Sequence, residues 1–340
     1  MTARYDFASD NVAGAAPEGL ESLIAANAGF ASGYGTDEVT RRAADLIRKR
    51  LGAPEAAVRF LASGTAANAI ALAMLAGPHE AVLAHEHAHI CTDETGAPGF
   101  FGAGVGLIPV PGASGKIDPE ALAQALEQPD VSYRQGPAAL SLTQATEYGG
   151  VYTVDALGRL IGTAKRKGLG VHLDGARLAN AVAAGFDLAD IRRLGVDVLV
   201  MGGTKAGLPL SEALVVFDPA LARRLDARLK HGGQLPSKGR FLASPWIGML
   251  ESDAWPERSG HANGMAARLA EAVRTRTAFR ITHPVEANAV FVDMDQPTLE
   301  RLQAQGWFVY RFLDGSVRLM CSWATTVEAV DAFADALARL

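Results

Sequence analysis

Asp174 and Lys205 are an acid and an amine that each come soon after a short apolar segment of the chain. The two segments, Leu169–Leu173 and Val196–Met201, have the length and composition of strands buried within a parallel sheet. In an open parallel sheet, ligands bind in the crevice at the carboxyl ends of the strands. We therefore expect the two side chains to share one site, although they are distant in sequence.

A lysine and a carboxylate in one buried site suit a particular chemistry. A lysine amine beside a glycine-flanked turn can form a Schiff base with an aldehyde, most often that of pyridoxal 5′-phosphate. A buried carboxylate such as that of Asp174 favours the protonated form of the ring nitrogen, which makes the ring an electron sink. The alternative is that both residues are ordinary surface side chains at two strand ends. This stretch alone fits either interpretation, because short motifs often match by chance.

Ser63, Gly64 and Thr65 follow a further apolar segment, Val58–Ala62, and precede a predicted helix over Ala69–Ala76. A strand followed by Ser-Gly-Thr and a helix is a plausible phosphate cradle. The helix N-terminus offers free N–H groups, the glycine allows close approach, and the hydroxyls donate hydrogen bonds. The alternative is that the hydroxyls only cap the helix.

Three histidines, His85, His87 and His89, alternate in sequence. On one strand they would share a face and could bind zinc, which would make the protein a metal-dependent lyase. However, Ala81–His85 is the better strand, and we expect the chain to turn after it so that the three imidazoles diverge. A single histidine, His89, could then stack on a planar cofactor.

Other polar residues occupy positions of interest. Thr143, Gln144 and Glu147 follow a predicted strand and are either site residues or part of a polar loop. Arg318 lies on an apolar strand, where it suits either a substrate carboxylate or a structural salt bridge. The glycine-rich basic loop 231–240 could bind an anion, contact another subunit or simply be solvated.

Near the N-terminus, residues 5–11 are interpreted as an extended segment that ends in Ser9, Asp10 and Asn11, or else as a helix cap. Tyr34 lies between two glycines in a turn cluster, where we expect it to be exposed to a ligand or a neighbouring subunit.

Composition excludes several classes of function. The chain has 340 residues, of which 49% are hydrophobic, and a net charge of −5. Because no basic cluster stands out, binding to nucleic acid or to an anionic membrane is disfavoured. No apolar segment is long enough to span a bilayer, and the N-terminus lacks a signal-peptide pattern. Two distant cysteines, Cys91 and Cys321, suit a reducing cytoplasm.

The order of elements predicts an α/β fold in which a mostly parallel sheet has helices on both faces, followed by a smaller α+β domain. We place the large domain at residues 1–250 and the small one at 251–340. The further strands expected are Leu107–Val110, Ala138–Thr143, Ala213–Phe217, Phe279–Thr282, Ala289–Asp293, Phe308–Phe312 and Val317–Cys321. The further helices expected are Glu38–Leu51, Asp118–Glu127, Thr153–Arg166, Pro219–Lys230, Phe241–Glu251, Ala262–Thr275, Thr298–Gln305 and Val327–Leu340.

Taken together, these motifs resemble those of the low-specificity L-threonine aldolases, which belong to the β-eliminating lyases among the fold-type-I pyridoxal phosphate enzymes. The resemblance covers nearly the whole chain. Its motifs occur in the expected order: Ser9-Asp-Asn, Tyr34-Gly-Thr-Asp, Ser63-Gly-Thr-Ala-Ala-Asn68, His89 with Glu94-Thr-Gly-Ala, Thr143-Gln-Ala-Thr-Glu147-Tyr-Gly, Asp174-Gly-Ala-Arg177, Gly-Gly-Thr204-Lys205 and Arg318.

The resemblance implies a role for each residue. Lys205 would carry the cofactor, Asp174 would pair with its ring nitrogen and His89 would stack on the ring. The resemblance assigns phosphate or cofactor binding to Ser63, Gly64, Thr65, Thr204 and Arg177. It assigns binding of the substrate carboxylate to Ser9, Arg177 and Arg318. Tyr34 and loop 232–238 would reach the site from a neighbouring subunit of a homotetramer. Some relatives have a histidine near the substrate hydroxyl where this chain has Glu147.

The resemblance also implies the reaction, a retro-aldol cleavage of L-threonine or L-allo-threonine to glycine and acetaldehyde. His89 and Glu147 are the candidate bases for the β-hydroxyl proton. Two alternatives stay open: a pyridoxal phosphate enzyme acting on a bulkier substrate such as phenylserine or by another reaction, and the metal-dependent lyase.

Overall fold

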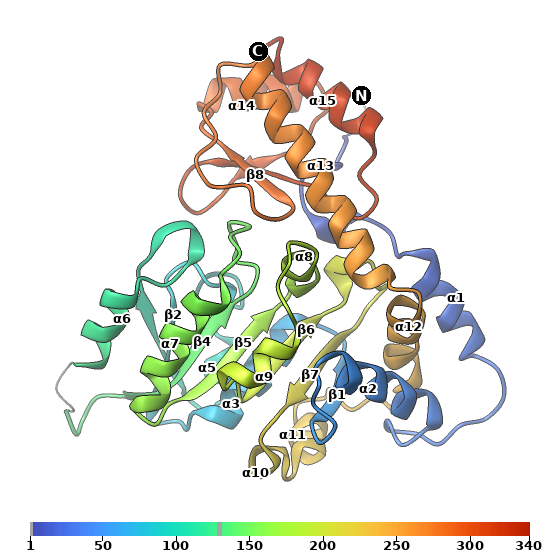
Figure 1. The fold of residues 1–340 in the computed structure, drawn as a ribbon, viewed down its shortest axis with the longest axis vertical. Coiled ribbons are helices and arrows are strands. Elements are labelled where there is room, and N and C mark those ends of the chain that lie inside the picture. The colour runs from blue at the N-terminus through green and yellow to red at the C-terminus, as the bar shows by residue number, and fades with distance from the viewer. Residues whose placement is uncertain (1–2, 128–130) are drawn as a thin grey trace.

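The computed structural model describes residues 3–127 and 131–340, and it contains two separate β-sheets (Figure 1). The larger sheet has seven strands in the order β1-β7-β6-β5-β4-β2-β3. These strands are β1 (Ala57–Leu61), β2 (Glu80–His85), β3 (Gly106–Val110), β4 (Gly136–Thr143), β5 (Gly170–Gly175), β6 (Val198–Gly202) and β7 (Glu212–Val216). The pairs from β3 to β6 are parallel, and β7 is antiparallel to both β6 and β1. The predicted mostly parallel, mixed sheet is therefore confirmed.

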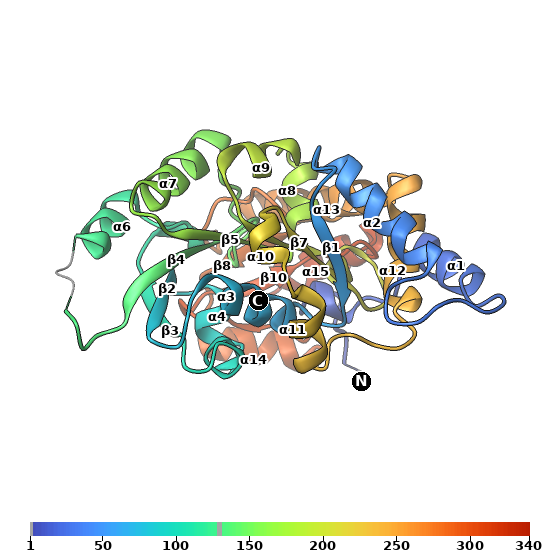
Figure 2. The ribbon, with the colours of Figure 1, turned by 90° about the horizontal axis from the view of Figure 1, so that it is seen from below.

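Helices cover both faces of this sheet (Figure 2). They are α1 (Pro17–Ala25), α2 (Glu38–Arg50), α3 (Gly64–Leu75), α4 (His89–Thr92), α5 (Ala97–Phe101), α6 (Pro119–Leu126), α7 (Val154–Arg166), α8 (Leu178–Ala183), α9 (Ala189–Leu194), α10 (Pro219–Ala222), α11 (Leu225–His231) and α12 (Arg240–Glu251), with short 3₁₀ turns η1 (Asp10–Val12), η2 (Ala113–Gly115) and η3 (Thr204–Ala206).

Strand β6 shows why its sequence is apolar throughout. Because side chains alternate along a strand, Leu199 and Met201 pack into the core that includes α7 and α9. Val198 and Val200 point to the opposite face and pack into the core beneath α3 and α11. All five residues of β6 are buried. A strand covered on both faces needs an unbroken apolar run.

The smaller sheet lies near the C-terminus and is antiparallel, in the order β8-β10-β9. Its strands are β8 (Ala289–Val292), β9 (Tyr310–Arg311) and β10 (Val317–Met320), and its helices are α13 (Ala254–Arg276), α14 (Gln296–Ala304) and α15 (Val327–Leu337). Phe7, from the N-terminal segment, is buried in the core of this second unit. Helix α13 contacts α8 and α12 as well as α15, so it joins the two parts of the molecule (Figure 1). The boundary at residue 250 stays a prediction.

Two local predictions were wrong, and for residues 5–11 the structure agrees with one of the two alternatives. The helix predicted over Pro219–Lys230 is two helices, α10 and α11, because Arg224 has φ +67 and interrupts it. The strand predicted over Phe279–Thr282 is reduced to an isolated bridge between Ile281 and Val292. The segment of residues 5–11 ends in the 3₁₀ turn η1, where the Ser9 hydroxyl accepts from the Asn11 N–H, as in the capping alternative.

Candidate active site

Two adjoining cavities lie beyond the carboxyl ends of the parallel strands and share four lining residues, Asn11, His89, Glu147 and Lys205. The first has a volume of about 280 Å³ and is also lined by Asp174. The second has a volume of about 400 Å³ and reaches Arg177 and Arg318. We name them the inner and the outer cavity.

Asp174 and Lys205 both line the inner cavity, as predicted. Asp174 is the buried residue before the last in β5, and Lys205 lies in η3, just after the neighbouring parallel strand β6. The Asp174 side chain is held from two sides: Oδ1 accepts from the Ala176 N–H at 2.9 Å, and Oδ2 accepts from Nδ2 of Asn68 at 2.9 Å. The carboxylate therefore has a fixed orientation in the wall of the cavity.

The lining of the inner cavity also includes the N-terminus of α3. Ser63 caps this helix, its Oγ accepting from the Ala66 N–H at 3.2 Å, and Gly64 and Thr65 form the first turn. A Cβ added to Gly64 would meet no atom within 4 Å, so the backbone is open to a ligand at this point. Thr204 also lines the inner cavity, and its Oγ1 accepts from the Ser211 N–H at 3.2 Å. An amine, a carboxylate and a helix N-terminus in one cavity fit pyridoxal phosphate.

The three histidines were expected to diverge, but the rings of His85 and His87 lie edge to face, with 5.7 Å between their centroids. Each of the three imidazoles has its own hydrogen-bond partner. His85 Nε2 hydrogen-bonds with the Gly112 carbonyl at 3.0 Å, and His87 Nδ1 with the Tyr148 hydroxyl at 2.6 Å. His89 Nδ1 hydrogen-bonds with Oε1 of Glu94 at 2.9 Å. Within residues 3–127 and 131–340, no three His, Cys, Asp or Glu side chains are grouped to hold a metal ion. The stacking of His89 on a cofactor stays a prediction.

Arg177 and Asp10 form a buried ion pair beside the outer cavity. Arg177 donates from Nε to Oδ2 of Asp10 at 2.7 Å and from Nη2 to Oδ1 at 2.9 Å. Its Nη1 lies 3.5 Å from Oε2 of Glu147. Burial alone would raise the pKa of Asp10, but the charges of Arg177 and Lys205 lower it to about 2. Asp10 therefore fixes one edge of the guanidinium, and the edge with Nη1 faces Glu147.

Arg318, on β10, is buried and lines the outer cavity. Its Nη2 donates to the Tyr310 hydroxyl, and its Cζ lies 5.1 Å from the Tyr310 ring centroid and 4.9 Å from that of Phe312. Nε is buried without a hydrogen-bond partner. No carboxylate in the described part of the chain forms a salt bridge with Arg318, so the structural ion pair considered above is not found there. Burial and the nearby charge of Arg177 lower the pKa of Arg318.

Ser9 lines the outer cavity, whereas Tyr34 lines neither cavity of this chain. Tyr34 is half exposed with φ +58, and its N–H donates to the Ser237 carbonyl at 3.0 Å. Lys230 Nζ lies 4.4 Å from the centre of its ring. Its contact with a site of a neighbouring subunit stays a prediction.

Sequence reasoning assigned no role to Glu212, a buried carboxyl at the start of β7 that also lines the inner cavity. Its Oε2 accepts from the Gly203 N–H at 2.8 Å, just before the turn that carries Lys205. Burial raises the pKa of Glu212 to about 7. The only available signal was a charged residue at the start of an otherwise apolar strand. Asn68 and Glu94 were named within the family motifs but given no role, and Tyr310 was not singled out.

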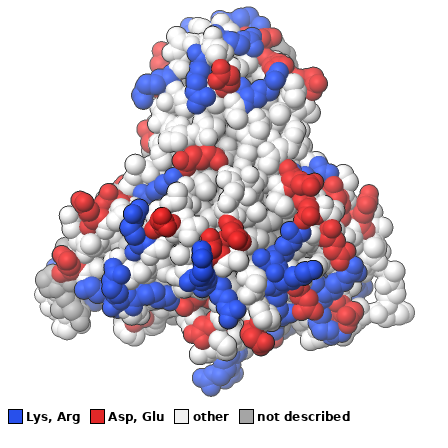
Figure 3. All heavy atoms as spheres, in the orientation of Figure 1, with Lys and Arg blue, Asp and Glu red and all other residues white. Residues whose placement is uncertain are grey.

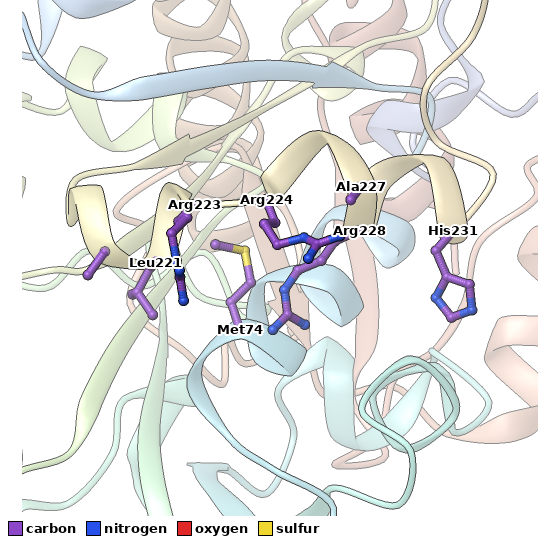
Figure 4. Close-up of a pocket in the computed structure, with 8 residues that line it drawn as sticks. Met74, Leu221, Arg223, Arg224, Ala227, Arg228 and His231 are labelled. Atoms are coloured by element: carbon purple, nitrogen blue, oxygen red, sulfur yellow. The ribbon is translucent and has the colours of Figure 1, made fainter.

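A larger hollow of about 440 Å³ lies elsewhere, between Met74 of α3 and the helices α10 and α11 (Figure 4). It is lined by Arg223, Arg224, Arg228 and His231 but by no lysine or carboxylate, and Arg228 donates to the Ala73 carbonyl at 3.1 Å. This hollow therefore lacks the groups that the inner cavity brings together. Elsewhere on the surface, acidic and basic side chains are interspersed over the face in Figure 3. In the described part of the chain, no helix combines the length and apolar character needed to cross a membrane.

Comparisons with known proteins agree with this arrangement. The family model described as beta-eliminating lyase matches residues 6–297. A low specificity L-threonine aldolase of Pseudomonas aeruginosa is 44% identical over 95% of this chain and 94% of that protein. One of Escherichia coli is 28% identical over 79% of each chain. The solved structure of a Leishmania major threonine aldolase is 31% identical, with a TM-score of 0.92 over 99% of each chain. The chain therefore belongs to the beta-eliminating lyase family, within the group of low-specificity L-threonine aldolases.

Proposed function

We propose that this protein is a pyridoxal-phosphate-dependent aldehyde lyase that cleaves L-threonine and L-allo-threonine to glycine and acetaldehyde. The observation that carries the proposal is the inner cavity, which joins Lys205, Asp174 and the N-terminus of α3. The relatives at 44% and 43% identity are both described as low specificity L-threonine aldolases, which supports the same reaction.

The residues of the inner cavity hold the cofactor. Lys205 would hold its aldehyde group, and Asp174 would pair with its ring nitrogen. Ser63, Gly64 and Thr65 would bind its phosphate, and Thr204 would contact the cofactor from the same cavity. When bound, pyridoxal phosphate accepts into its ring the electron pair that is released when a bond to the substrate Cα breaks.

Residues of the outer cavity orient the substrate. Arg318 and the Nη1 edge of Arg177, which both belong to residues lining the outer cavity, bind the substrate carboxylate, with Ser9 beside them. Fixing the carboxylate determines which bond of Cα is aligned for cleavage. Such alignment is worth about 7–11 kcal/mol of barrier in the best-oriented cases.

His89 and Glu147 are the candidate bases for the β-hydroxyl proton, because both line both cavities. Among the described residues, Nε2 of His89 makes no hydrogen bond, so it is free to reach a substrate. Glu147 Oε2 lies 3.5 Å from Arg177 Nη1, at the edge of the outer cavity where the substrate is placed. Each residue can therefore accept a proton directly or through a water molecule.

A bulkier substrate such as phenylserine is the second candidate. The outer cavity has a volume of about 400 Å³, and Tyr310, Phe312 and Leu313 form part of its lining. An apolar and aromatic wall of this kind suits a side chain larger than the methyl group of threonine.

The test is a substrate panel of threonine, allo-threonine, serine and phenylserine in both enantiomers. We expect acetaldehyde and glycine in equal amounts from L-threonine and L-allo-threonine, with no product from the Lys205→Ala variant. If ammonia and an oxo acid form in place of acetaldehyde, the enzyme is an eliminating lyase and not an aldolase. Activity that a chelator abolishes but Lys205→Ala leaves intact would support the metal-dependent lyase.

We also propose a cytoplasmic homotetramer, built from dimers, whose sites include Tyr34 and loop 232–238 of a neighbouring subunit. The exposed position of Tyr34 and its contact with Ser237 support this assembly. Free Cys91 and Cys321 suit a reducing compartment. Sedimentation measures the assembly. If Tyr34 acts across an interface, mixing the Lys205→Ala and Tyr34→Ala variants should restore activity, because some hybrid sites are then intact. No recovery would place Tyr34 outside the site.

A further inference from the structure

A continuous line of hydrogen bonds connects His89 with Asp174. His89 Nδ1 bonds with Oε1 of Glu94 at 2.9 Å, and the same oxygen accepts from Nδ2 of Asn68 at 2.9 Å. Nδ2 of Asn68 also donates to Oδ2 of Asp174 at 2.9 Å. The line therefore runs from α4 and the loop after it, through α3, to the end of β5. It joins two side chains that line the inner cavity.

The two connecting residues are buried, with exposed fractions of 2% for Asn68 and 4% for Glu94. Both protons of one amide group are used on two carboxylates, while Oδ1 of Asn68 and Oε2 of Glu94 have no partner. Buried polar atoms without partners are uncommon, and each needs a reason. Here Asn68 and Glu94 each leave one oxygen without a hydrogen bond, while their other polar atoms connect His89 to Asp174. We take this connection as the reason for the arrangement.

The chemistry of the groups fixes the direction of the hydrogen bonds. An ionised carboxylate can only accept, so Nδ1 of His89 carries the proton when Glu94 is charged. The second ring nitrogen, Nε2, is then left for the cavity. The hydrogen bond to Glu94 raises the pKa of His89, with smaller contributions from the charges of Glu147 and Glu94, while burial and Lys205 oppose it.

Glu94 itself needs support. Burial raises its pKa, and so does the charge of Asp174, whereas the hydrogen bonds from His89 and Asn68 lower it. Asn68 hydrogen-bonds both carboxylates and, together with His89, opposes the rise in the pKa of Glu94. Losing this bond would raise the pKa of Glu94 further, and a neutral carboxyl stabilises a charged imidazole less.

We propose that Glu94 and Asn68 are positioning residues, with Glu94 keeping the proton on Nδ1 of His89 and Asn68 tying Glu94 to Asp174. The role assigned to His89 in catalysis rests on the proposed function, but the hydrogen-bonded line does not. Neither residue needs to touch the substrate to act in this way.

The test compares three variants that change one buried polar group each. Glu94→Gln removes the charge but keeps the shape, and Asn68→Ala removes the bridge. Tyr152→Phe is the matched control, because it removes a buried hydrogen bond, at 2.6 Å to the Ile117 N–H, from a residue that lines neither cavity. NMR of the imidazole C–H group of His89, assigned with His89→Gln, gives its pKa in holoenzyme and cofactor-free protein alike.

We expect Glu94→Gln to lower the pKa of His89 by about 1, because it removes an adjacent opposite charge. Asn68→Ala should lower it by less, and Tyr152→Phe should leave it unchanged. Glu94→Asp, which keeps the charge, should retain part of the effect and serves if Glu94→Gln does not fold. In the holoenzyme, the acid limb of kcat/KM should move to lower pH in Glu94→Gln.

The proposal is overturned if the pKa of His89 is the same in Glu94→Gln and the wild type, or if Asn68→Ala behaves like Tyr152→Phe. These titrations do not depend on turnover. A wild type without aldolase activity would therefore refute the proposed function and still leave the NMR result to decide the role of Glu94 and Asn68.

Discussion

Replacing Glu212 with glutamine should make the stability of this protein less dependent on pH. Glu212 is buried beside the turn that carries Lys205, and burial raises its pKa from 4.5 to about 7. The Gly203 N–H, the Thr204 side chain and the charge of Lys205 oppose this rise, and the charge of Asp174 adds to it. Glu212→Gln keeps the shape of the neutral carboxyl and removes the ionisation.

The sign follows from the two pKa values. The carboxyl is harder to ionise in the folded protein than in the unfolded chain. Its contribution to the free energy of unfolding is therefore fully present below pH 4.5 and is lost as the pH rises through about 7. The difference of about 2.5 pKa units corresponds to about 3 kcal/mol between the two limits, at 1.36 kcal/mol per unit. Between pH 5 and pH 8, the free energy of unfolding of the wild type should fall by about 2.5 kcal/mol because of this group.

Urea unfolding of the cofactor-free protein at pH 5, 6, 7 and 8 measures this effect. Relative to the wild type, Glu212→Gln should gain about 2.5 kcal/mol in free energy of unfolding between pH 5 and pH 8. Glu120→Gln, at an exposed position in the first turn of α6, is the control. Its free energy of unfolding should change with pH in the same way as that of the wild type. Curves for Glu212→Gln that also run parallel to the wild type would refute the reasoning.

Three further variants test the site. Asp174→Asn should sharply lower kcat while the protein keeps its bound cofactor, seen by absorbance, and wild-type turnover would contradict the electron-sink role. Arg318→Ala removes a charged hydrogen-bond donor worth about 1.5–3 kcal/mol, so KM should rise about 10- to 100-fold, whereas an unchanged KM would make this arginine structural. Asp10→Ala leaves Arg177 buried without its carboxylate and should lower the free energy of unfolding in urea by about 3–5 kcal/mol; a loss under 1 kcal/mol would show that the pair contributes little.

The parts of the site that sequence reasoning found share one property. Asp174 lies at the end of a buried strand, and Lys205 and Gly64 follow strands, so the local pattern is enough to place them at one edge of the sheet. The order and type of most elements follow from the same pattern, since apolar runs and capping residues are local features. This is why the α/β architecture was predictable.

The parts that were missed depend on contacts between distant segments. Asp10 pairs with Arg177, and Asn68 bridges Glu94 to Asp174, but no local spacing encodes either contact. The predicted helix over Pro219–Lys230 failed for a different reason. Arg224 adopts a positive φ, which no residue preference at that position would indicate.

The central claim, that Lys205 is the amine bonded to pyridoxal phosphate, has a direct test. Treating the holoenzyme with borohydride fixes the cofactor to whichever amine holds it, and mass spectrometry of the digested protein then identifies the modified peptide. We predict a pyridoxyl group on Lys205 and none on the Lys205→Ala variant. A modified lysine elsewhere, or the same modification in Lys205→Ala, would contradict the account.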